Sequence, residues 1–530
     1  MELGDPPQPV SQSVELTASP RRGIVSLIRP PITIFPRSLS HYGPVPPIGL
    51  AYLAAVLRDA GHAVNIVDAP IEGMDQYEDI ESSIGSLRHV GLSAEQIVDQ
   101  IPEDVDVVGI SNMFLHEWPI SREIAEMVRK LRPDALVVLG GENATAFRRW
   151  IFEETDAVDC VVIGEGEGTL LTLVDQYLAG ASLEDIPGTA MRPGLDLPVR
   201  DNGLPVRQRQ LAEVPWPAWD LVPLDRYWDY ADFHGVNRGR YIPVMATRGC
   251  PYQCSFCSSP QMWTTRYVVR EPEDIADEIE RYVDHFGVKN VNFHDLTAIT
   301  KRKWTLRFCD ALEERNLDLV WQLPVGTRSE ALDAEVLQRL WDTGCRNITY
   351  APESGSERML EIFKKKVDLD HMLESLGEAH RIGLRTRVNI IVGHPDETWP
   401  DMWKSLKFLV RAAWRGCDDA SVIMFCAYPG SADFERLYES GEFELDEIAM
   451  YVGLSRTSSS SHRSYNPRMN SRQMRRGQFT LLTTFYALTL VRRPRRVIEH
   501  IVSVLGGRET TTLDQFLRIK WRGFRSMSKW

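Results

Sequence analysis

Three cysteines, Cys250, Cys254 and Cys257, gather in one short loop just after the apolar run 241–246. Their spacing is C-x3-C-x2-C. Three cysteines cannot all pair in disulfides, because one thiol stays unpaired. A structural zinc site needs a fourth ligand, and no C-x2-C or H-x3-H motif that could supply one lies nearby. Iron–sulfur clusters are held by thiolates at such spacings, usually four of them. Three thiolates on a four-iron cluster would leave one iron open for a substrate or cofactor, whereas the alternative is three ordinary buried cysteines.

The composition is that of an ordinary soluble protein with two or three domains. The chain has 530 residues, of which 43% are hydrophobic and 25% charged. Its formal net charge of −14 argues against general affinity for nucleic acid or anionic surfaces. Only three of the eight cysteines cluster, which favours a reducing compartment. The N-terminus lacks the features of a signal peptide, and the uncharged run 477–491 is shorter than the roughly 20 residues of a membrane span, so we expect a cytoplasmic protein.

The first part of the chain predicts a doubly wound, Rossmann-like α/β domain. Residues 1–22 are polar and rich in Pro and Ser, so we expect them to be disordered. From 23 to 180, short apolar strands alternate with helices, which is typical of a parallel sheet covered on both faces. The strands are expected at 23–28, 63–67, 105–111, 135–139 and 158–163, and the helices at 48–60, 120–131 and 168–178.

Ligands of such sheets bind beyond the carboxyl ends of the strands. Glycine at these ends lets the backbone approach a large flat ligand closely. Such glycines are weak evidence by themselves, because the turns of every sheet of this kind contain them. The residues at these ends are Asp68, Ser111, Asn112, Gly140, Gly141, Glu142, Gly164, Glu165 and Gly166.

Residues 241–430 repeat a strand–helix unit six times. The strands are expected at 242–247, 290–295, 319–325, 346–351, 386–392 and 421–425, and the helices at about 273–285, 301–315, 333–342, 356–380 and 398–413. Sites in barrels of such units lie at the C-terminal ends of the strands. The cysteine loop, Asp295, Arg328 and Glu353 occupy those ends. We expect the scattered cysteines to pack in helices or strands; they are Cys309, Cys345, Cys417 and Cys426, the last being the least certain because it lies near the barrel mouth.

Two further regions flank this unit. Residues 181–240 are rich in Pro, Asp and Arg and predict a linker lying over the second domain. Residues 431–530 predict a C-terminal region with a loop at 457–461 that could be mobile and a helical stretch at 472–505. From residue 492 onward there are ten Lys or Arg against three Asp or Glu, interleaved with aromatic residues. Such a tail could touch a membrane surface or an anionic substrate, but we favour a helical cap packed on the acidic barrel.

The cysteine spacing, with Phe256 just before the last thiol, resembles the radical S-adenosylmethionine (SAM) superfamily. That resemblance implies a partial (β/α)6 barrel and a 4Fe–4S cluster whose open iron chelates the amino and carboxylate groups of SAM. One electron from the cluster would cleave SAM to a 5′-deoxyadenosyl radical. The stretches 47–50, 140–141 and 164–167 resemble the cobalamin-binding domain that precedes many such cores. Over residues 23–430 the chain therefore resembles the cobalamin-binding-domain (class B-like) radical SAM enzymes.

The resemblance also assigns residues to the cobalamin. Many cobalamin-binding domains carry Asp-x-His-x-x-Gly, whose histidine is the lower cobalt ligand, and this chain has Asp68, Pro70 and Gly73 in that pattern. Proline excludes ligation there, as is common in the radical SAM branch. His116 could replace the ligand, although a hydrogen-bonded surface histidine is the better interpretation. A nucleotide or flavin site is the alternative for the whole domain.

For SAM, the resemblance implies that the Phe256 region stacks on the adenine, and that Glu353 and Ser354 face the ribose and the methionine end. The turn formed by Val392, Gly393 and Pro395 would approach the adenine. Asp295 and Arg328 would bind SAM or the substrate inside the barrel mouth. Where the family often has a second acid before the Asp, this chain has His294, which leaves the local polar network open.

Together these features predict methyl transfer to an unactivated carbon, or to a phosphinate phosphorus, of a small-molecule substrate. One SAM would methylate cob(I)alamin, and a second would supply the radical that abstracts a substrate hydrogen. An external electron donor such as flavodoxin or ferredoxin is implied. The alternatives are a cyclase or rearrangement enzyme with the same cofactors and, more remotely, a non-catalytic cobalamin or redox sensor, for which we find no DNA-binding or effector module.

Overall fold

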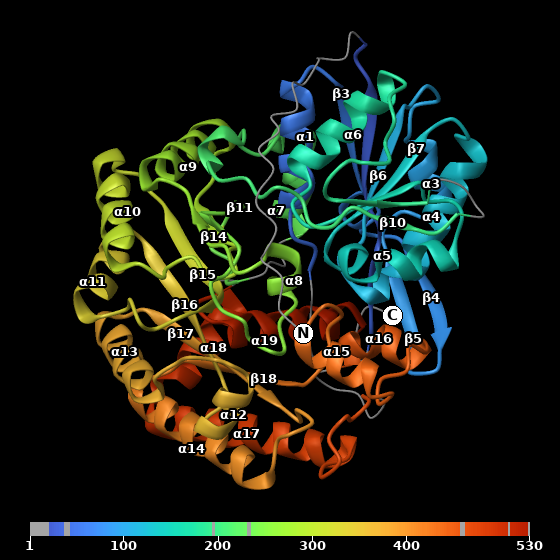
Figure 1. Cartoon of the computed structure of the whole chain (residues 1–530). Coiled ribbons are helices and arrows are strands. Elements are labelled where there is room, and N and C mark those ends of the chain that lie inside the picture. The colour runs from blue at the N-terminus through green and yellow to red at the C-terminus, as the bar shows by residue number, and fades with distance from the viewer. Residues whose placement is uncertain are drawn as a thin grey trace, which may run out of the picture.

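The structure is a computed structural model that describes residues 21–36, 43–192, 197–230, 235–455, 462–506 and 509–527. Residues 1–20 of the predicted N-terminal tail and the predicted loop 457–461 lie outside the described residues. Two α/β units lie side by side, with most of the C-terminal helices against the second (Figure 1).

The first unit contains the predicted parallel sheet. Its five parallel strands are β1 (Ile24–Arg29), β3 (Ala63–Asp68), β6 (Val107–Ser111), β7 (Leu136–Gly140) and β8 (Cys160–Val162), in the spatial order β8-β7-β6-β1-β3. Most residues of these strands are buried because helices cover both faces of the sheet, whereas the first half of the edge strand β3 is partly exposed. The sheet continues beyond the boundary expected at residue 180, through antiparallel β9 (Thr189–Met191) and β10 (Arg200–Asp201). Strands of two or three residues are too short to show a period.

The helices expected in this unit form as α1 (Ile48–Asp59), α4 (Trp118–Leu131) and α6 (Glu167–Leu178). Not expected were α2 (Ala69–Glu72), α3 (Ala94–Asp99) and α5 (Glu142–Glu154), nor a three-stranded antiparallel sheet in the order β2-β5-β4. Its strands are β2 (Ile32–Ile34), β4 (Tyr77–Ser82) and β5 (Gly85–Val90). The sequence of β4 is Tyr-Glu-Asp-Ile-Glu-Ser, whose exposed charged side chains hide the strand pattern.

The second unit is the predicted six-unit barrel, with all strands parallel and adjacent in chain order (Figure 1). They are β11 (Tyr241–Val244), β14 (Asn290–Phe293), β15 (Val320–Thr327), β16 (Cys345–Glu353), β17 (Arg385–Val392) and β18 (Asp419–Met424). The outer helices are α9 (Pro272–Phe286), α10 (Arg302–Arg315), α11 (Ala334–Asp342), α12 (Glu357–Ile362), α13 (Leu369–Ile382) and α14 (Trp399–Arg415).

The single helix expected at 356–380 is in fact two, α12 and α13. Lys364 between them has φ +53°, and the Asp368 side chain accepts hydrogen bonds from the backbone N–H groups of Asp370 and His371 to begin α13. Asp368 is thus an N-cap inside what looks like a continuous helical pattern. The break between the two helices places Lys365, the residue after Lys364, beside the cysteine loop.

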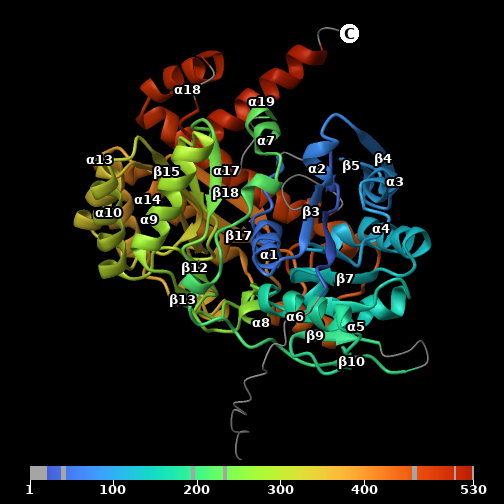
Figure 2. The same ribbon diagram turned by 90° about the horizontal axis from the view of Figure 1, so that it is seen from above.

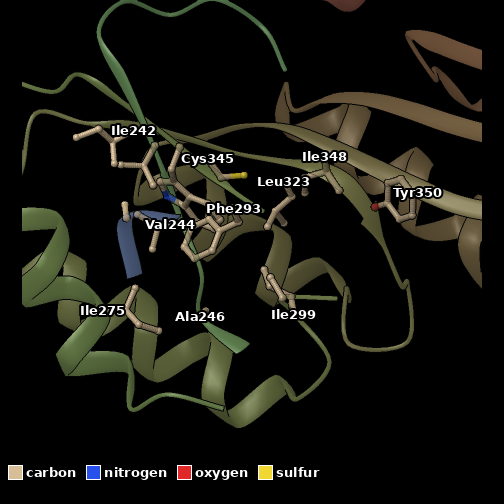
Figure 3. Close-up of a cluster of buried hydrophobic side chains, with 14 of the residues drawn as sticks. Ile242, Val244, Ala246, Ile275, Phe293, Ile299, Leu323, Cys345, Ile348 and Tyr350 are labelled. Atoms are coloured by element: carbon tan, nitrogen blue, oxygen red, sulfur yellow. The ribbon is translucent and has the colours of Figure 1, made fainter. Parts of the chain in front are cut away.

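Alternation along the barrel strands separates two environments. Ile242, Phe293 and Leu323 point outward into a buried apolar layer shared with Ile275 of α9 (Figure 3). Cys345 lies in the same layer, and the other scattered cysteines are buried as expected. On the opposite face of the same strands, side chains are polar; Gln322 Nε2, for example, donates to Asn290 Oδ1 at 2.9 Å. The barrel is therefore held from outside by hydrophobic burial and has a polar interior.

The linker lies between the two units rather than over the second alone. It contains the 3₁₀ turns η2 (Leu211–Glu213) and η3 (Trp219–Leu221) and the helix α7 (Leu224–Tyr230). Ala218 N donates to Ala51 O of α1, while Trp216 Nε1 donates to Asp274 Oδ1 of α9, at 2.9 and 3.0 Å. Trp219 is fully buried between them.

The C-terminal region is helical, and its basic segment from residue 492 packs on the barrel, as the sequence led us to favour. Its helices are α15 (Ala432–Glu439), α16 (Glu447–Ser455), α17 (Ser471–Arg492), α18 (Arg495–Gly506) and α19 (Thr512–Met527). Helix α16 instead packs against the 3₁₀ turn η1 (Leu115–Glu117) of the first unit. Helix α17 packs along α14 and β18. Helices α18 and α19 lie over the end of the barrel at which the strands begin (Figure 2). No helix in the described part of the chain is long and apolar enough to cross a membrane.

Candidate active site

The cysteine loop lies at the C-terminal end of β11, between the short strand β12 (Thr247–Arg248) and the helix α8 (Ser259–Trp263). Cys250, Cys254 and Cys257 are half-buried, whereas the other five cysteines are buried. Burial raises the pKa of the Cys254 thiol, and it raises that of Cys257 to about 12. These thiols therefore need a positive partner to ionise at neutral pH.

The three thiols of the loop form a donor set that fits an iron–sulfur cluster. Within the described residues, no three His, Cys, Asp or Glu side chains stand close enough together to hold one metal ion. Two thiolates on one tetrahedral ion would be roughly 4 Å apart. A four-iron cluster takes each thiolate on a different iron, so its cysteines stand further apart. Three half-exposed thiols on one loop match that donor set.

Asp295 holds the start of the loop. Its carboxylate accepts from Ala246 N at 3.1 Å and from Thr247 Oγ1 at 2.6 Å, and also from Thr247 N. Burial raises the pKa of Asp295 to about 6 despite these bonds. Both carboxylate oxygens are thus engaged by the backbone and side chain before the cysteines, which gives Asp295 a positioning role that we had not predicted.

The middle of the loop is tied to the rest of the barrel mouth through Ser255. Its N–H donates to Phe363 O at 3.0 Å, and its Oγ donates to Asp433 Oδ2 of α15 at 2.8 Å. His394 Nε2 lies 3.1 Å from the same Asp433 oxygen. His394 is completely buried, with its ring edge-on to Phe363 and to Phe425. Hydrogen bonds therefore join the loop to α15, and the contact of His394 with Asp433 brings the turn after β17 against both.

Two cations face the cysteines. Lys365 Nζ is 3.1 Å from Glu353 Oε1 and 6.0 Å from the centre of the Phe256 ring. The Arg328 guanidinium lies 3.7 Å above the Tyr252 ring and 2.6 Å from Glu330 Oε1. Both cations lower the pKa of Cys254 against the effect of burial. Arg328 was predicted at the site; Lys365 was not, because it is one of three consecutive lysines with no distinguishing pattern.

The strand-four element lies where it was predicted, at the end of β16. Glu353 has φ +66°, a conformation that costs a non-glycine residue of order 1–3 kcal/mol and is concentrated at functional sites. Ser354 is buried; its Oγ accepts from Ser356 N at 3.1 Å and lies 3.3 Å from Ser405 Oγ of α14. The Ser354 hydroxyl thus holds the turn, and the Glu353 carboxylate stays at the mouth beside Lys365.

The turn after β17 packs under α17. Val392 is buried at the end of the strand, and Gly393 follows with φ +84°. This positive φ favours glycine, and a Cβ on Gly393 would also require the Met474 side chain of α17 to move. Gly393 N donates to the Glu397 carboxylate, and burial raises the pKa of Glu397 to about 8. Pro395 continues the turn. His394 of this turn contacts Asp433, which also binds Ser255 of the cysteine loop.

The C-terminal edge of the first sheet has open glycines. A Cβ added to Gly140, or to Gly49 and Gly168 at the starts of α1 and α6, would meet no atom within 4 Å. Met113 and Phe114, after β6, are 40% and 49% exposed. An apolar edge with room above the backbone fits a large flat ligand such as a corrin ring.

Other glycines predicted there serve the packing of the domain. A Cβ on Gly73 would overlap the backbone of Leu92, and one on Gly141 would come within 2.7 Å of Asn112 O. Gly164 has φ +69°, and a Cβ on Gly166 would lie 3.2 Å from a Leu53 methyl. Backbone proximity explains Gly73 and Gly141, the positive φ explains Gly164, and a tight contact with a Leu53 methyl bears on Gly166, so packing accounts for these glycines without a ligand.

The polar residues of this edge are largely used inside the protein. Asp68 accepts from Tyr227 Oη at 2.5 Å and lies 3.5 Å from Arg29 Nη1, and burial raises its pKa. Asn112 accepts from Asn143 Nδ2 at 2.6 Å and donates to Ser121 Oγ at 3.2 Å.

Ser111 is half-buried at the end of β6, and Pro70 is buried in α2. The His116 ring stacks on Phe114 with centroids 5.3 Å apart. No geometry at Pro70 can supply a cobalt ligand, and the role of His116 stays a prediction.

Contacts across the domain boundary join this edge directly to the cysteine loop. Arg248, two residues before Cys250, donates to Glu165 at 3.3 Å and to Glu167 at 2.6 Å. Arg207 of the linker donates to the same Glu165 at 2.7 Å. On the other side of the loop, Ser258 Oγ donates to the Glu142 carboxylate. Both flanks of the loop are thus fixed to the carboxyl ends of the first sheet.

Two family models match the two units in this order. The B12 binding domain matches residues 38–174, and the radical SAM superfamily matches residues 244–409. The chain belongs to the radical SAM enzymes that carry a cobalamin-binding domain. The cofactors of this family are cobalamin, a 4Fe–4S cluster and SAM, and the thiol loop and the open glycine edge described above fit them.

Similar proteins agree with this assignment. The chain is 28% identical over 394 residues to an uncharacterized methyltransferase of Pyrococcus horikoshii, covering 74% of this chain and 78% of the relative. It is 27% identical to the cytidylyl-2-hydroxyethylphosphonate methyltransferase of Streptomyces wedmorensis, covering 70% and 73%. It is also 27% identical to the anaerobic magnesium-protoporphyrin IX monomethyl ester cyclase of Cereibacter sphaeroides, covering 76% and 61%.

Solved structures share the fold. The radical SAM methyltransferase TsrM of Kitasatospora setae, with cobalamin and a [4Fe–4S] cluster bound, superposes with a TM-score of 0.60 at 18% identity, covering 79% of this chain and 78% of that one. The cobalamin-dependent radical SAM enzyme OxsB superposes with a TM-score of 0.61 at 17% identity, covering 79% and 55%.

Proposed function

We propose that this radical SAM enzyme is a cobalamin-dependent methyltransferase acting on an unactivated carbon, or a phosphinate phosphorus, of a small molecule. One observation carries the proposal: Arg248 and Ser258, on either side of the cysteines, bind Glu165 and Glu142 at the carboxyl ends of the first sheet. A cluster site and a corrinoid site held this closely together would serve two coupled steps on one substrate.

The chain's own residues supply binding and orientation. Cys250, Cys254 and Cys257 would hold the cluster, and Lys365 and Arg328 would offset the charge of the thiolates. Glu353 and the turn that follows Val392 would face SAM. When bound, the cluster and SAM supply the 5′-deoxyadenosyl radical, and the cobalamin supplies the methyl group.

The first domain's residues would hold the cobalamin, with no imidazole at the position of Pro70. The open glycine Gly140 and the exposed side chains of Met113 and Phe114 would lie against the corrin face. Pro70 offers no ligand, and it is buried in α2.

The test is product stoichiometry under anaerobic reduction. With SAM, cobalamin, a reductant such as reduced flavodoxin and the true substrate, S-adenosylhomocysteine and 5′-deoxyadenosine should form in about equal amounts, because each belongs to one of two coupled steps. Cys254→Ala should abolish 5′-deoxyadenosine, whereas Cys309→Ala, in the buried core of α10, should keep it. Formation of 5′-deoxyadenosine with turnover but without S-adenosylhomocysteine would overturn methyl transfer and support the ring-forming alternative, which the similarity to the cyclase favours.

A further inference from the structure

Helix α18 is amphipathic, but it buries its polar face and exposes its apolar face. Its inward face is polar, and Arg496, His500 and Ser503 are buried. Arg496 Nη1 lies 2.7 Å from Asp418 Oδ1 at the start of β18, and His500 Nδ1 lies 2.5 Å from Asp514 Oδ1 of α19. A surface helix normally buries its apolar stripe and exposes its polar one. Polar contacts, rather than hydrophobic burial, attach α18 to the barrel.

The outward face of α18 is apolar. Ile498, Ile501, Val502 and Leu505 are 63%, 54%, 62% and 67% exposed. Their spacing of i, i+3, i+4 and i+7 places them in one stripe along the helix. A continuous row of exposed aliphatic side chains marks an interaction site, because scattered single ones are the norm on a soluble surface.

Exposed basic side chains lie beside the start of this stripe, and the one acidic residue of α18, the exposed Glu499, is paired with Arg385. Residues 492–530 contain ten Lys or Arg and three Asp or Glu, in a chain whose net charge is −14. Arg492 and Arg495 are exposed beside the start of α18, and Lys520 is exposed on α19 next to Trp521, which is itself 40% exposed. Apolar side chains flanked by basic ones are the combination that binds an anionic lipid surface.

We propose that the α18 stripe, Ile498, Ile501, Val502 and Leu505, docks on an anionic lipid bilayer and holds the enzyme peripherally at a membrane surface. The helix would lie in the interface plane, because no described helix can span the membrane. The proposal does not depend on which reaction the enzyme catalyses.

Two other occupants of the stripe fit less well. A dimer that pairs two copies of α18 in parallel would bring their exposed Arg492 and Arg495 side chains together, which costs electrostatic energy. An electron donor docked here would lie at the wrong end of the barrel. Figure 2 shows α18 at one end and β12, β13 (Val268–Val269) and α8, which flank the cysteine loop, at the other. A donor has to approach the cysteines instead.

Vesicle flotation of the full-length protein tests the proposal. We expect binding to vesicles of phosphatidylcholine with 30% phosphatidylglycerol, weaker binding at high salt, and little binding to phosphatidylcholine alone. The variant I498S/I501S/L505S should bind the anionic vesicles at least tenfold more weakly. The matched control is L197S/L204S/V206S, which removes three exposed aliphatic residues from the linker and should bind like the parent.

Three outcomes would overturn the proposal. One is that the parent protein fails to float with anionic vesicles. Another is that the α18 variant binds as tightly as the parent while its circular dichroism and melting temperature are unchanged. The third is a concentration-dependent dimer in light scattering that the α18 variant loses, which would make the stripe an interface between two copies of the chain.

Discussion

Lys365 carries a buried positive charge beside the cysteine loop. Its Nζ is 3.1 Å from Glu353 Oε1, and its charge lowers the pKa of Cys254. Reduction adds a negative charge to a cluster, so a nearby cation favours the reduced form. Glu353 offsets part of that effect, which leaves a smaller net contribution than an isolated lysine would make.

Replacing Lys365 with Met should therefore lower the reduction potential of the cluster, by an amount on the order of tens of millivolts. Lys365→Arg keeps the charge and should leave the potential near that of the parent. A redox titration followed by electron paramagnetic resonance measures both. An unchanged potential in Lys365→Met, with full iron content, would show that Glu353 cancels the lysine.

Glu397 gives the protein a pH dependence of known sign. Burial raises its pKa from the usual 4.5 to about 8, so between these values the folded state binds a proton that the unfolded state has lost. Stability contributed by this group is full below the unfolded pKa and is lost as pH rises through the folded one. The slope is at most about 1.4 kcal/mol per pH unit.

The variant Glu397→Gln removes that titration and keeps an acceptor for Gly393 N. We expect its melting temperature to fall less than that of the parent between pH 5 and 8. The control is Glu103→Gln, at an exposed position, which should follow the parent curve. If Glu397→Gln follows the parent curve as well, Glu397 does not carry the predicted proton.

The difference between the cysteines and these two residues shows what the sequence can predict of a site. The cysteine motif was recognisable because its members lie within eight residues and need no fold to bring them together. Lys365 and Glu397 acquire their roles only by burial and by contact with segments elsewhere in the chain. Asp295 and Glu165 were noticed for their positions at strand ends, but their partners, Thr247 and Arg207, could not be read from the pattern.

At the scale of elements, the sequence correctly predicted the strands and helices that have long apolar patterns. It did not predict the short or polar ones. Five strands of the first sheet and six of the barrel appear at the expected places because both faces of each are covered. The hairpin β4–β5 was missed because its side chains are charged, and β9 and β10 because they are so short. The break between α12 and α13 depends on Asp368 as an N-cap, which competes with an apparently continuous helix.

The elements of the two domains meet in a buried ion-pair network. Glu165, in the loop after β8, lies between Arg207 of the linker and Arg248 of β12, and the three side chains are at most 7% exposed. Removing one partner of a buried ion pair leaves the others uncompensated, which costs about 3–5 kcal/mol. A single substitution in this network therefore lowers the free energy of unfolding, even where the intact ion pair adds little net stability.

We expect Glu165→Gln to lower the free energy of unfolding by about 3–5 kcal/mol. Asp318→Asn, which removes the exposed Lys289–Asp318 pair, should cost less than about 1 kcal/mol. Urea unfolding followed by circular dichroism compares the two variants with the parent. Equal, small effects would mean that water reaches Arg207 and Arg248 and that the boundary is not closed as described.

Across the whole molecule, one hydrophobic core passes from the first domain into the barrel. It includes Val25 of β1, Ala51 of α1, Trp219 of the linker and Val244 of β11. Trp219 is 1% exposed. Two domains that share a core and a buried ion-pair network should unfold together, although a chain of this length often unfolds domain by domain. The sequence predicted two separate domains with a linker over one of them, because nothing in a Pro-rich connector reveals which surfaces its tryptophans join.

The last prediction concerns this shared core. The parent protein should show a single calorimetric transition, and Trp219→Ala should lose about 3–5 kcal/mol, because a large aromatic ring is deleted from a fully buried position. Since Trp219 lies where the linker contacts both α1 and α9, the same change should separate the transition into two. Trp403→Ala removes a ring that is 58% exposed on α14 and should leave one transition, with the free energy of unfolding within about 0.5 kcal/mol of the parent. Two transitions already present in the parent would show that the domains fold independently. The contacts of Arg248 and Ser258 with the first sheet would then be a docking of separate units, and the two cofactor sites could move apart during turnover.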